Sequence, residues 1–547
     1  GPFFFARVPP APHPAAMAFR SPPPVSLLLA ALLSWGGRAD AQAPVPPSAW
    51  QVTPANVESG RRAAEVHCAN CPLKPSPELL DRRTWFEQVL PRMKVRVGLY
   101  PPAMADNDEI RFMREHAVIA PEPIMTEAEF TAVVDYYLSQ APETALPQPP
   151  GPELQIGLKT FRFEPVRHRA APPATTLVKI LPGPDGRLLV GDDFTRALTF
   201  LDGRLALRES LTLGNTPVAA RMSGDGLLLA NIGSFQPAQS QLGAVVRWTR
   251  DAGGWQPQTL VTNLPRTTDV QEADLNGDGR PDLVVSVFGN FIGRLAWYEA
   301  TDSGWREHRL FDKPGCIRTD VRDWTGNGRP DILALFAQET EAMYLFVNEG
   351  GGEFTPREIF RHHPLFGHSW FEVADLDGDG RPDLVVTNGD NGEYPSPLKN
   401  YHGVRIYLNR GDLRFEEAWF HPLNGAFRVL ARDFDLDGDP DLAVISFFPD
   451  YVAQPRESFV YFENLGGLKF RPFTFPECIA GRWLVMDAGD LDGDGDEDLV
   501  LGSYIKGPTP VPGALMDIWE RSGPSAVVLR NTTREPALPD PPTQLGR

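Results

Sequence analysis

An aspartate-rich loop recurs along this chain and constrains its fold more than any other feature. The clearest copy places carboxylates at positions 1, 3, 5 and 9 of the segment 375–384, DLDGDGRPDL. Ca²⁺ takes six to eight oxygen ligands, and position 7 of such a loop normally lends its backbone carbonyl. The loop is not an EF-hand, because no glutamate follows at position 12 and an apolar, strand-like run begins at once. The spacing predicts a calcium loop that leads directly into a β-strand.

Five copies of this loop follow one another, with first residues 49, 52, 58 and 57 positions apart. A repeat of this length indicates an array or a propeller. Asp, Asn and Gly also make ordinary turns, but turn chemistry alone does not fix carboxylates at positions 1, 3, 5 and 9. For the second copy, which has only two carboxylates, calcium and a plain turn both stay open. We expect four or five calcium sites. The predicted ligands are Asp274, Asn276, Asp278, Arg280 and Asp282; Asp323, Thr325, Asn327, Arg329 and Asp331; Asp375, Asp377, Asp379, Arg381 and Asp383; Asp433, Asp435, Asp437, Asp439 and Asp441; and Asp490, Asp492, Asp494, Asp496 and Asp498.

Each loop precedes an apolar strand, an apolar-aromatic strand, a Gly/Asn turn and a strand rich in Phe and charge. Two earlier copies lack the full loop, and the seventh ends at 526–531 without an outer strand. Seven units of four strands predict an all-β, seven-bladed propeller over residues 159–533. Residues 160–167 match the missing outer strand, so we expect them to complete the last blade near Asn531 and remove an open sheet edge.

These loops resemble FG-GAP/VCBS repeats, the family that includes the integrin α-chain propeller. Val287-Phe288-Gly289 follows one of the loops, and the resemblance covers about residues 161–533. It implies calcium on the loops that join the first two strands of a blade, on one face of the propeller. Function in such propellers usually lies on the opposite face, although a shared fold does not fix the activity.

The period is helical from about Val52 to Glu143, which predicts a small all-α domain over residues 42–143, before the propeller. A helix over 56–67 runs into Cys68-Ala69-Asn70-Cys71, and Thr126 and Glu129 form a capping box for the last helix. With Leu-Pro-Arg-Met93 between them, this order of parts resembles a class I cytochrome c, above all the variant fused to aspartate-rich repeats in exported bacterial proteins. The resemblance implies thioether attachment of haem c at Cys68 and Cys71, with Met93 as an axial ligand.

Pro72 stands where the haem-attachment motif requires a histidine, and proline has no ligating atom. Three interpretations stay open. The first, favoured by the missing ligand, is a haem-free domain with a Cys68–Cys71 disulfide. The second is covalent haem with an unusual or absent axial ligand, and the third is a metal-binding or redox dithiol.

The remaining segments predict export. Residues 1–41 read as upstream sequence and a signal peptide with a small-x-small cleavage site, so we expect a periplasmic or extracellular protein. Residues 144–158 form a Pro-rich linker, and 534–547 a tail. The net charge is −19, and 17 aspartates occupy positions 1, 3, 5 and 9 of the loops. No basic patch points to nucleic acid. We expect a monomer without a transmembrane segment.

A long polar and aromatic loop on the face opposite the aspartates suggests recognition of an unknown protein or carbohydrate. The alternative is a loop that packs against its neighbour. No catalytic residue is assigned. We expect a non-catalytic binding or adhesion module, and the alternative is a periplasmic electron-transfer protein or redox-enzyme subunit. The candidate ligand-binding residues are His368, Asp390, Asn391, Lys399, Tyr401, His402 and Asp450.

Overall fold

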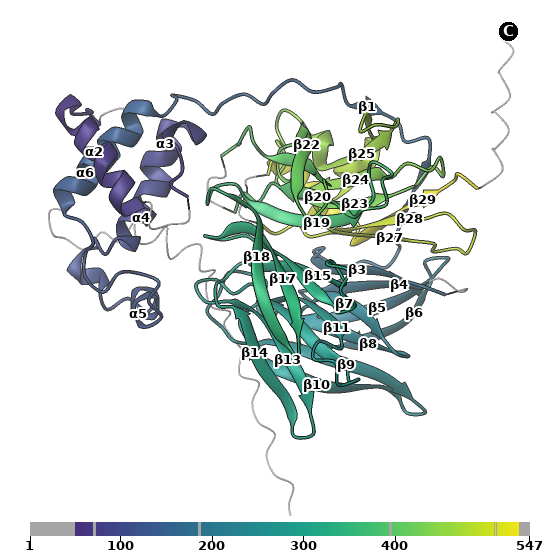
Figure 1. Ribbon diagram of the computed structural model, residues 1–547. Coiled ribbons are helices and arrows are strands. Elements are labelled where there is room, and N and C mark those ends of the chain that lie inside the picture. The colour runs from purple at the N-terminus through teal and green to yellow at the C-terminus, as the bar shows by residue number, and fades with distance from the viewer. Residues whose placement is uncertain are drawn as a thin grey trace, which may run out of the picture. The chain divides into compact units, whose positions relative to one another are not determined.

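The structure is a computed structural model that describes residues 50–68, 73–183, 187–392, 397–507, 509 and 511–534. Seven sheets succeed one another along the chain after the helical segment and form a propeller, with one sheet per blade (Figure 1). The predicted seven-bladed propeller is therefore confirmed. The predicted signal peptide, Cys71, Pro72 and residues 535–547 lie outside the described residues.

In each of the first six blades, the strands pair in chain order from the first strand to the fourth. Blades one to three contain β3 (Thr175–Leu181), β4 (Arg187–Asp192), β5 (Ala197–Asp202) and β6 (Leu207–Thr212); β7 (Pro217–Ser223), β8 (Gly226–Asn231), β9 (Gly243–Asp251) and β10 (Gly254–Leu264); and β11 (Thr267–Ala273), β12 (Asp282–Val287), β13 (Arg294–Thr301) and β14 (Gly304–Phe311). Blades four to six contain β15 (Cys316–Arg322), β16 (Asp331–Phe336), β17 (Glu341–Gly350) and β18 (Glu353–His362); β19 (His368–Ala374), β20 (Asp383–Asn388), β21 (Gly403–Asn409) and β22 (Phe415–Pro422); and β23 (Ala426–Arg432), β24 (Asp441–Ser446), β25 (Phe459–Asn464) and β26 (Phe470–Thr474).

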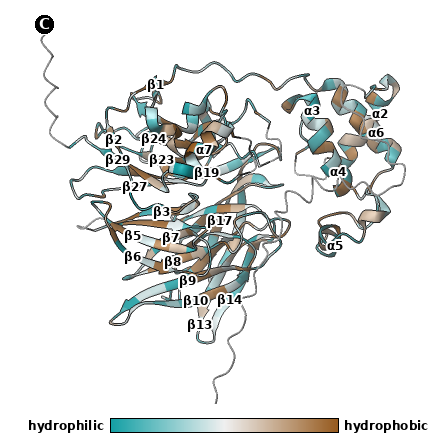
Figure 2. Cartoon of the chain, turned by 180° about the vertical axis from the view of Figure 1, so that it is seen from behind, coloured by the Kyte–Doolittle hydropathy of each residue, from teal (hydrophilic) through white to brown (hydrophobic). Residues whose placement is uncertain are grey.

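The second strand of each Asp-loop blade is buried along its whole length, as in β12, β16, β20, β24 and β28 (Asp498–Ser503). Each is a short apolar run, because it lies between two strands of its own sheet and is covered on both faces. The outer strands carry most of the exposed polar residues, and Figure 2 shows hydrophobic residues concentrated along the strands within the blades.

The last blade closes the ring with a strand from the start of the propeller. β2 (Phe161–Pro165) pairs antiparallel with β29 (Ala526–Asn531), next to β28 and β27 (Trp483–Gly489), and Phe161 lies opposite Asn531. Beyond the strands, the Thr532 N–H donates to the Thr160 carbonyl at 2.9 Å. The predicted closure is thereby confirmed.

The linker does more than space the two parts of the chain. β1 (Gln155–Ile156) adds a fifth, parallel strand to the sixth blade through β26, and the Gly157 N–H donates to the Thr474 carbonyl at 2.7 Å. Sequence reasoning treated this segment as a spacer. A two-residue strand has no periodicity to detect, and its position depends on the open edge that β26 offers.

The helices of the N-terminal part are α2 (Pro54–His67), η3 (Pro77–Leu79), α3 (Arg82–Thr84), η4 (Trp85–Val89), α4 (Leu90–Arg96), η5 (Pro102–Met104), α5 (Asp108–Glu115) and α6 (Glu127–Gln140). The capping box at Thr126 and Glu129 is present, and α6 buries Phe130, Val133 and Tyr137. The resemblance to cytochrome c stays a prediction. Shorter elements on the propeller are η6 (Pro455–Ser458), η7 (Pro476–Ala480) and α7 (Gly513–Ser522). Of the helices in the described part of the chain, none combines the length and apolarity needed to cross a membrane.

Candidate calcium loops and the opposite face

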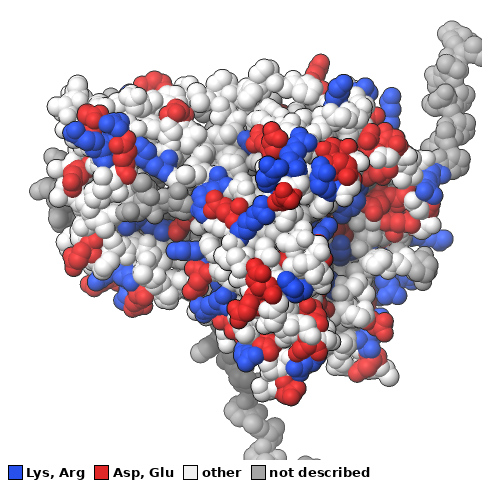
Figure 3. Space-filling model, in the orientation of Figure 1, with Lys and Arg blue, Asp and Glu red and all other residues white. Residues whose placement is uncertain are grey.

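The five aspartate loops connect the first and second strands of five consecutive blades, from β11–β12 to β27–β28. Because all first strands of a propeller run in the same direction, these loops lie on one face. We call residues 274–282, 323–331, 375–383, 433–441 and 490–498 the Asp loops. On the side drawn in Figure 3, acidic and basic side chains are interspersed, with several acidic ones grouped beside the C-terminal blades.

The first carboxylate of each loop organises its backbone. Asp375 Oδ1 accepts hydrogen bonds from the N–H groups of Gly378 (2.9 Å) and Asp379 (3.1 Å), and Oδ2 accepts one from Gly380 (2.8 Å). Gly378 and Gly380 have φ of 75° and 82°, values that a side chain would strain. The sequence spacing therefore matches a tight turn wrapped around the first carboxylate.

Carboxylate oxygens converge in three of the Asp loops. One oxygen from each member of a triad lies within 4.8 Å of the others, and the triads are Asp375, Asp377 and Asp383; Asp433, Asp435 and Asp437; and Asp490, Asp492 and Asp494. Such oxygen-only sets fit a hard cation such as Ca²⁺. Burial together with the neighbouring carboxylates raises the pKa of Asp435 and Asp492, so a cation would relieve like-charge repulsion there.

Position 7 distinguishes the loops from one another. Arg280 and Arg381 each donate their backbone N–H to the position-5 carboxylate of their own loop at 2.9 Å, and their guanidinium groups pair with the same carboxylate. Where position 7 is an aspartate, only the backbone bond is kept: the N–H of Asp439 donates to Asp437 at 3.0 Å. A cation bound in the Arg-containing loops therefore competes with an internal ion pair for the position-5 oxygens.

The carboxylate at position 9 ties its loop to the third strand of the blade. Asp383 is fully buried; its Oδ2 accepts from the Leu376 N–H at 2.9 Å and its Oδ1 from the Asn409 N–H at 2.8 Å. Asp282, Asp331, Asp441 and Asp498 make the same two kinds of bond. Burial raises the pKa of Asp441 and Asp498 to about 7. The residue predicted as a ligand is thus also a structural anchor.

Sequence reasoning missed the partners of these anchors. Four asparagines at the ends of third strands donate their backbone N–H to the position-9 carboxylate and their side-chain amide to the position-8 carbonyl of the loop; they are Asn348, Asn409, Asn464 and Asn531. The signal was present, because an asparagine recurs at the end of each of these strands. We call these four residues the anchor asparagines.

The second loop departs most from a cation site. The Thr325 hydroxyl donates to Asp331 Oδ2 at 3.0 Å, and the Asn327 Oδ1 accepts from the Arg329 N–H at 2.9 Å. This loop has carboxylates only at Asp323 and Asp331, so a turn held by hydrogen bonds accounts for its geometry. The calcium prediction for this copy stays open.

The opposite face contains the loops between second and third strands, where ligand-binding residues were expected. The structure buries four of them, namely His368, Asn391, Lys399 and His402, each at most 3% exposed. Asp390 and Tyr401 are half-buried, as is Asp450, whose Oδ1 caps a turn by accepting from Val452 and Ala453. Asn391, Lys399 and His402 of the long loop are therefore packed inside the fold, and the four buried residues are not presented to a partner.

Beneath this loop lies a buried cluster of histidines. The Nδ1 of His362 and the Nε2 of His368 are 3.1 Å apart, and the His368 N–H donates to Glu341 at 2.8 Å. Burial lowers the pKa of His362 and His363 to about 4, so these rings are neutral at pH 7. Within the described ranges, the histidines do not bring three ligating atoms within 4.8 Å of one another, as the aspartates do.

The haem-binding residues are only partly described. Met93 lies on α4 and is 37% exposed, and Cys68 follows α2. Cys71 and Pro72 are outside the described residues, so neither a disulfide nor a haem attachment can be located, and both remain predictions.

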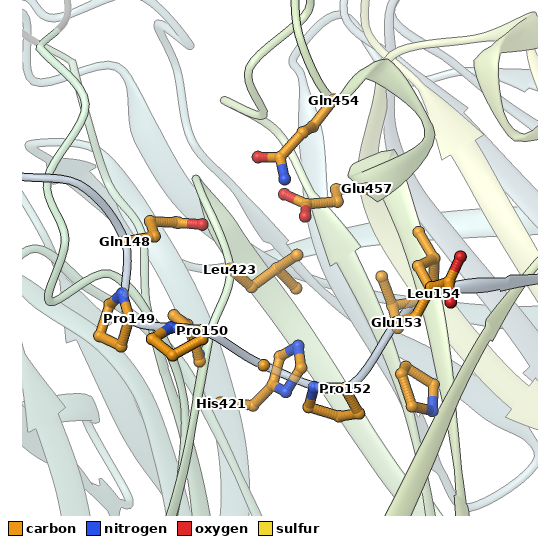
Figure 4. Close-up of a pocket in the computed structure, with 14 residues that line it drawn as sticks. Gln148, Pro149, Pro150, Pro152, Glu153, Leu154, His421, Leu423, Gln454 and Glu457 are labelled. Atoms are coloured by element: carbon orange, nitrogen blue, oxygen red, sulfur yellow. The ribbon is translucent and has the colours of Figure 1, made fainter.

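A pocket of about 400 Å³ lies between the linker and the fifth and sixth blades (Figure 4). Pro149, Pro150 and Pro152 line it from the linker, and His421, Gln454 and Glu457 line it from the blades. Burial, with the charge of Asp450 nearby, raises the pKa of Glu457 to about 7. This pocket was not foreseen, because it exists only where the linker crosses these two blades.

Comparison with known proteins identifies the repeats. An FG-GAP-like repeat model matches residues 323–386, and an FG-GAP repeat model matches residues 369–408. Among curated proteins, the chain is similar to phosphatidylinositol-glycan-specific phospholipase D of Homo sapiens, with 29% identity over 215 residues. The match covers 34% of this chain and 24% of that protein, so the chain spans about a quarter of the length of that relative.

Similar solved structures include two crystal structures of BBS1N in complex with ARL6DN. The one soaked with mercury has 13% identity, a TM-score of 0.40 and coverage of 67% of this chain and 97% of the other. The one soaked with lead has 13% identity, a TM-score of 0.42 and coverage of 69% and 97%. A structure of S. cerevisiae dbp5 bound to nup159 has 8% identity, a TM-score of 0.40 and coverage of 71% and 98%. The fold and the two model matches together establish that this chain carries FG-GAP repeats within a seven-bladed β-propeller.

Proposed function

We propose that this chain is an exported, non-catalytic binding module whose propeller is stabilised by calcium in the Asp loops and contacts its partner on the opposite face. The observation that carries the proposal is the convergence of three carboxylates within 4.8 Å in each of three Asp loops. An FG-GAP propeller is a scaffold suited to binding, because its connecting loops form two faces on a rigid ring.

The Asp375, Asp433 and Asp490 loops offer the strongest calcium sites. In the Asp433 and Asp490 loops the converging carboxylates at positions 1, 3 and 5 would hold the ion with the position-7 carbonyl. In the Asp375 loop the converging carboxylates are those at positions 1, 3 and 9, and Asp379 at position 5 would join them on release from Arg381. Ca²⁺ would neutralise oxygens that otherwise repel one another, and it would join the ends of the first and second strands of a blade. Its role here is structural, and the Asp274 loop would bind by the same positions with Asn276 as a neutral ligand.

The opposite face is the proposed partner surface because the Asp-loop face is occupied by cation ligands and anchors. The proposed partner is a protein or a carbohydrate. FG-GAP repeats are typical of extracellular and periplasmic proteins, and a calcium-containing compartment would keep the loops loaded.

Calcium titration of the chelated full chain tests the first half of the proposal. We expect about four saturable sites and the loss of one in Asp379→Ala. Asp312→Ala is the matched control, because Asp312 is an exposed carboxylate that pairs with Arg309 outside the Asp loops and should leave the stoichiometry unchanged. Absence of saturable calcium binding would refute this half.

Capture on glycan and peptide arrays tests the second half, with the full chain measured in calcium and in chelator. We expect capture in calcium but not in chelator, because calcium stabilises the propeller, and we expect Asp312→Ala to leave capture unchanged. An absorption spectrum of the same sample distinguishes the binding module from the alternative, an electron-transfer protein. A Soret band would show bound haem and assign an electron-transfer role to the helical part.

A further inference from the structure

The first strands of the seven blades line the axis of the propeller (Figure 1). We call β3, β7, β11, β15, β19, β23 and β27 the inner strands. They carry six basic residues and five acidic ones, although the whole chain has a net charge of −19. The axis is therefore not acidic like the rest of the molecule.

A register shift after the first residue aligns the inner strands. It lies between Thr267 and Asp269 in β11 and between Ala426 and Arg428 in β23, and the other five inner strands have it at the same place. A β-bulge at this point re-aims the residue that follows it. The third residues of four neighbouring inner strands are thus equivalent, and they are Asp269, Arg318, Trp370 and Arg428.

Ion pairs engage each acidic side chain of the inner strands, and three of these five side chains pair with a neighbouring inner strand. Asp487 pairs with Lys179 at 2.9 Å, and Asp269 pairs with Arg221 at 3.1 Å. Glu372 pairs with Arg318 and, at 3.3 Å, with Arg432. Asp320 accepts from Arg322 at 2.5 Å, and Glu272 pairs outward with Arg247 of β9. Each carboxylate of the inner strands therefore already has a cation.

Arg428 is the basic side chain of the inner strands that has no such partner. Within the part of the chain that the structure describes, its guanidinium makes neither an ion pair nor a hydrogen bond, and its Nε is buried without an acceptor. The guanidinium instead makes a cation–π contact with the ring of Trp370, whose centroid lies 4.0 Å from Arg428 Cζ. Arg318 lies over the same indole at 4.3 Å.

An uncompensated guanidinium in a partly desolvated wall is energetically costly, because burial removes water without supplying a counter-charge. Burial, reinforced by the like charge of Arg318, lowers the pKa of Arg428 to about 10, so the group is still cationic at pH 7. Asp269, Glu372 and Asp487 are near enough to act on it electrostatically, but they are bound to other cations.

Arg428 also lies toward the end of the axis where a partner would arrive. It is the third residue of β23, whose first residue begins at the face opposite the Asp loops, and whose last residue, Arg432, directly precedes Asp433. A ligand that enters the axis from the proposed partner face therefore reaches the third residues of the inner strands before it reaches their fifth residues.

We propose that Arg428, flanked by Trp370 and Arg318, forms an oxyanion site that binds a carboxylate-bearing ligand from the face opposite the Asp loops. The inference rests on the proposed function, since it names the chemistry that the binding face recognises. A guanidinium offers two parallel N–H donors that match a carboxylate, and such charge-assisted pairs are among the strongest hydrogen bonds of proteins.

Isothermal titration of the calcium-loaded full chain with sodium benzoate and sodium sulfate tests the site at constant ionic strength. We expect saturable binding of benzoate, and tighter binding of sulfate would overturn the assignment of a carboxylate-bearing ligand. Arg428→Gln should weaken binding roughly tenfold or more, since hydrogen bonds to charged groups contribute about 1.5–3 kcal/mol. The affinity of Arg428→Lys for benzoate should lie between those of the unaltered chain and Arg428→Gln, because lysine keeps the charge but lacks the two parallel N–H donors of a guanidinium.

Arg322→Gln is the matched control, since Arg322 is a paired arginine at the Asp-loop end of the same axis and should leave anion binding unchanged. Unfolding of Arg428→Gln is not a concern for the test, because the change removes an unpaired charge and should keep or raise the melting temperature. A crystal soaked with 4-bromobenzoate should show anomalous signal at Arg428. Absence of saturable binding by the unaltered chain, or undiminished binding by Arg428→Gln, would overturn the proposal.

The two proposals fail in distinguishable ways. Calcium-dependent capture on the arrays by a chain that binds no benzoate or sulfate would overturn the axial site and leave the binding module intact. Benzoate binding at Arg428 by a chain that captures nothing on the arrays would keep the site and refute the module.

Discussion

Asp383 and Asn409 join the Asp loop of the fifth blade to its third strand, with the Asn409 N–H donating to Asp383 Oδ1 at 2.8 Å. The second oxygen of Asp383 accepts from the Leu376 N–H at 2.9 Å. Asp383→Ala leaves both donors unsatisfied in the interior, so we expect a loss of about 2–5 kcal/mol in the free energy of unfolding. Urea denaturation in calcium and in chelator measures it.

Asp379→Ala is the control for this prediction, because it lies in the same loop but is partly exposed and pairs with Arg381. It should destabilise the protein in calcium and have little effect in chelator. If both variants lose stability only in calcium, position 9 is merely a ligand and not an anchor.

Removal of calcium should lower the melting temperature of the unaltered chain. Without the ion, three carboxylates remain within 4.8 Å of one another in the Asp375, Asp433 and Asp490 loops, and their repulsion opposes the fold. Differential scanning calorimetry with excess chelator, and again after calcium is restored, checks the prediction. An identical melting temperature in both conditions would exclude bound calcium as a stabilising element.

Ring closure should require β2. Deletion of residues 159–168 removes the strand that pairs with β29 and exposes the apolar edge of the last blade, so the product should aggregate or lose its cooperative unfolding transition. Deletion of residues 42–143 should leave a folded propeller. Size-exclusion chromatography and circular dichroism compare the two truncations, and equal behaviour would contradict the closing role of β2.

Acid should destabilise the propeller through its buried histidines. Burial lowers the pKa of His362, His363 and His421 to about 4, below the value of about 6.5 for an unfolded chain. The unfolded state therefore binds more protons as the pH falls from 6.5 to 4, and stability falls in that window by at most about 1.4 kcal/mol per pH unit for each histidine.

His421→Phe isolates one of these groups. The phenyl ring keeps the packing against Trp419 and Phe462 but does not titrate, so the slope of unfolding free energy against pH should decrease by the contribution of one proton. An unaltered slope in His421→Phe would mean that His421 takes up its proton in the folded state.

The helical part should lack ordinary six-coordinate haem c. Pro72 cannot coordinate iron, so expression with a cytochrome-maturation system should give no sharp reduced α-band. Mass measurement should find Cys68 and Cys71 two hydrogens light, as a disulfide. Gain of haem by Pro72→His would identify a decayed cytochrome, whereas a Soret band in the unaltered chain would contradict the prediction.

The repeats and the closure of the ring could be predicted from the sequence because both depend on short residue patterns that recur along the chain. The Asp loops are recognised by the spacing of their aspartates, and the second strands are short apolar runs. Residues 160–167 match the outer strand that the last blade lacks. These features depend on periodicity and on chain order, which sequence preserves. The loop turns also follow from local chemistry, since Asp375 bonds to backbone groups three to five residues away.

The role of individual side chains depended on what lies beside them. Lys399 belongs to a polar loop and His368 begins β19, yet both are buried. The bond of the His368 N–H to Glu341 of the neighbouring blade is not revealed by any local pattern. Asp383 looks like its fellow ligands, yet its bond to Asn409 makes it an anchor. Arg428 is one of many arginines in the sequence, and only the ring of inner strands, in which every carboxylate is engaged, leaves it without a counter-charge. The sequence determined the blades and their loops because those are periodic and local, whereas pairing across the axis and burial beneath the loops arose only when distant strands met.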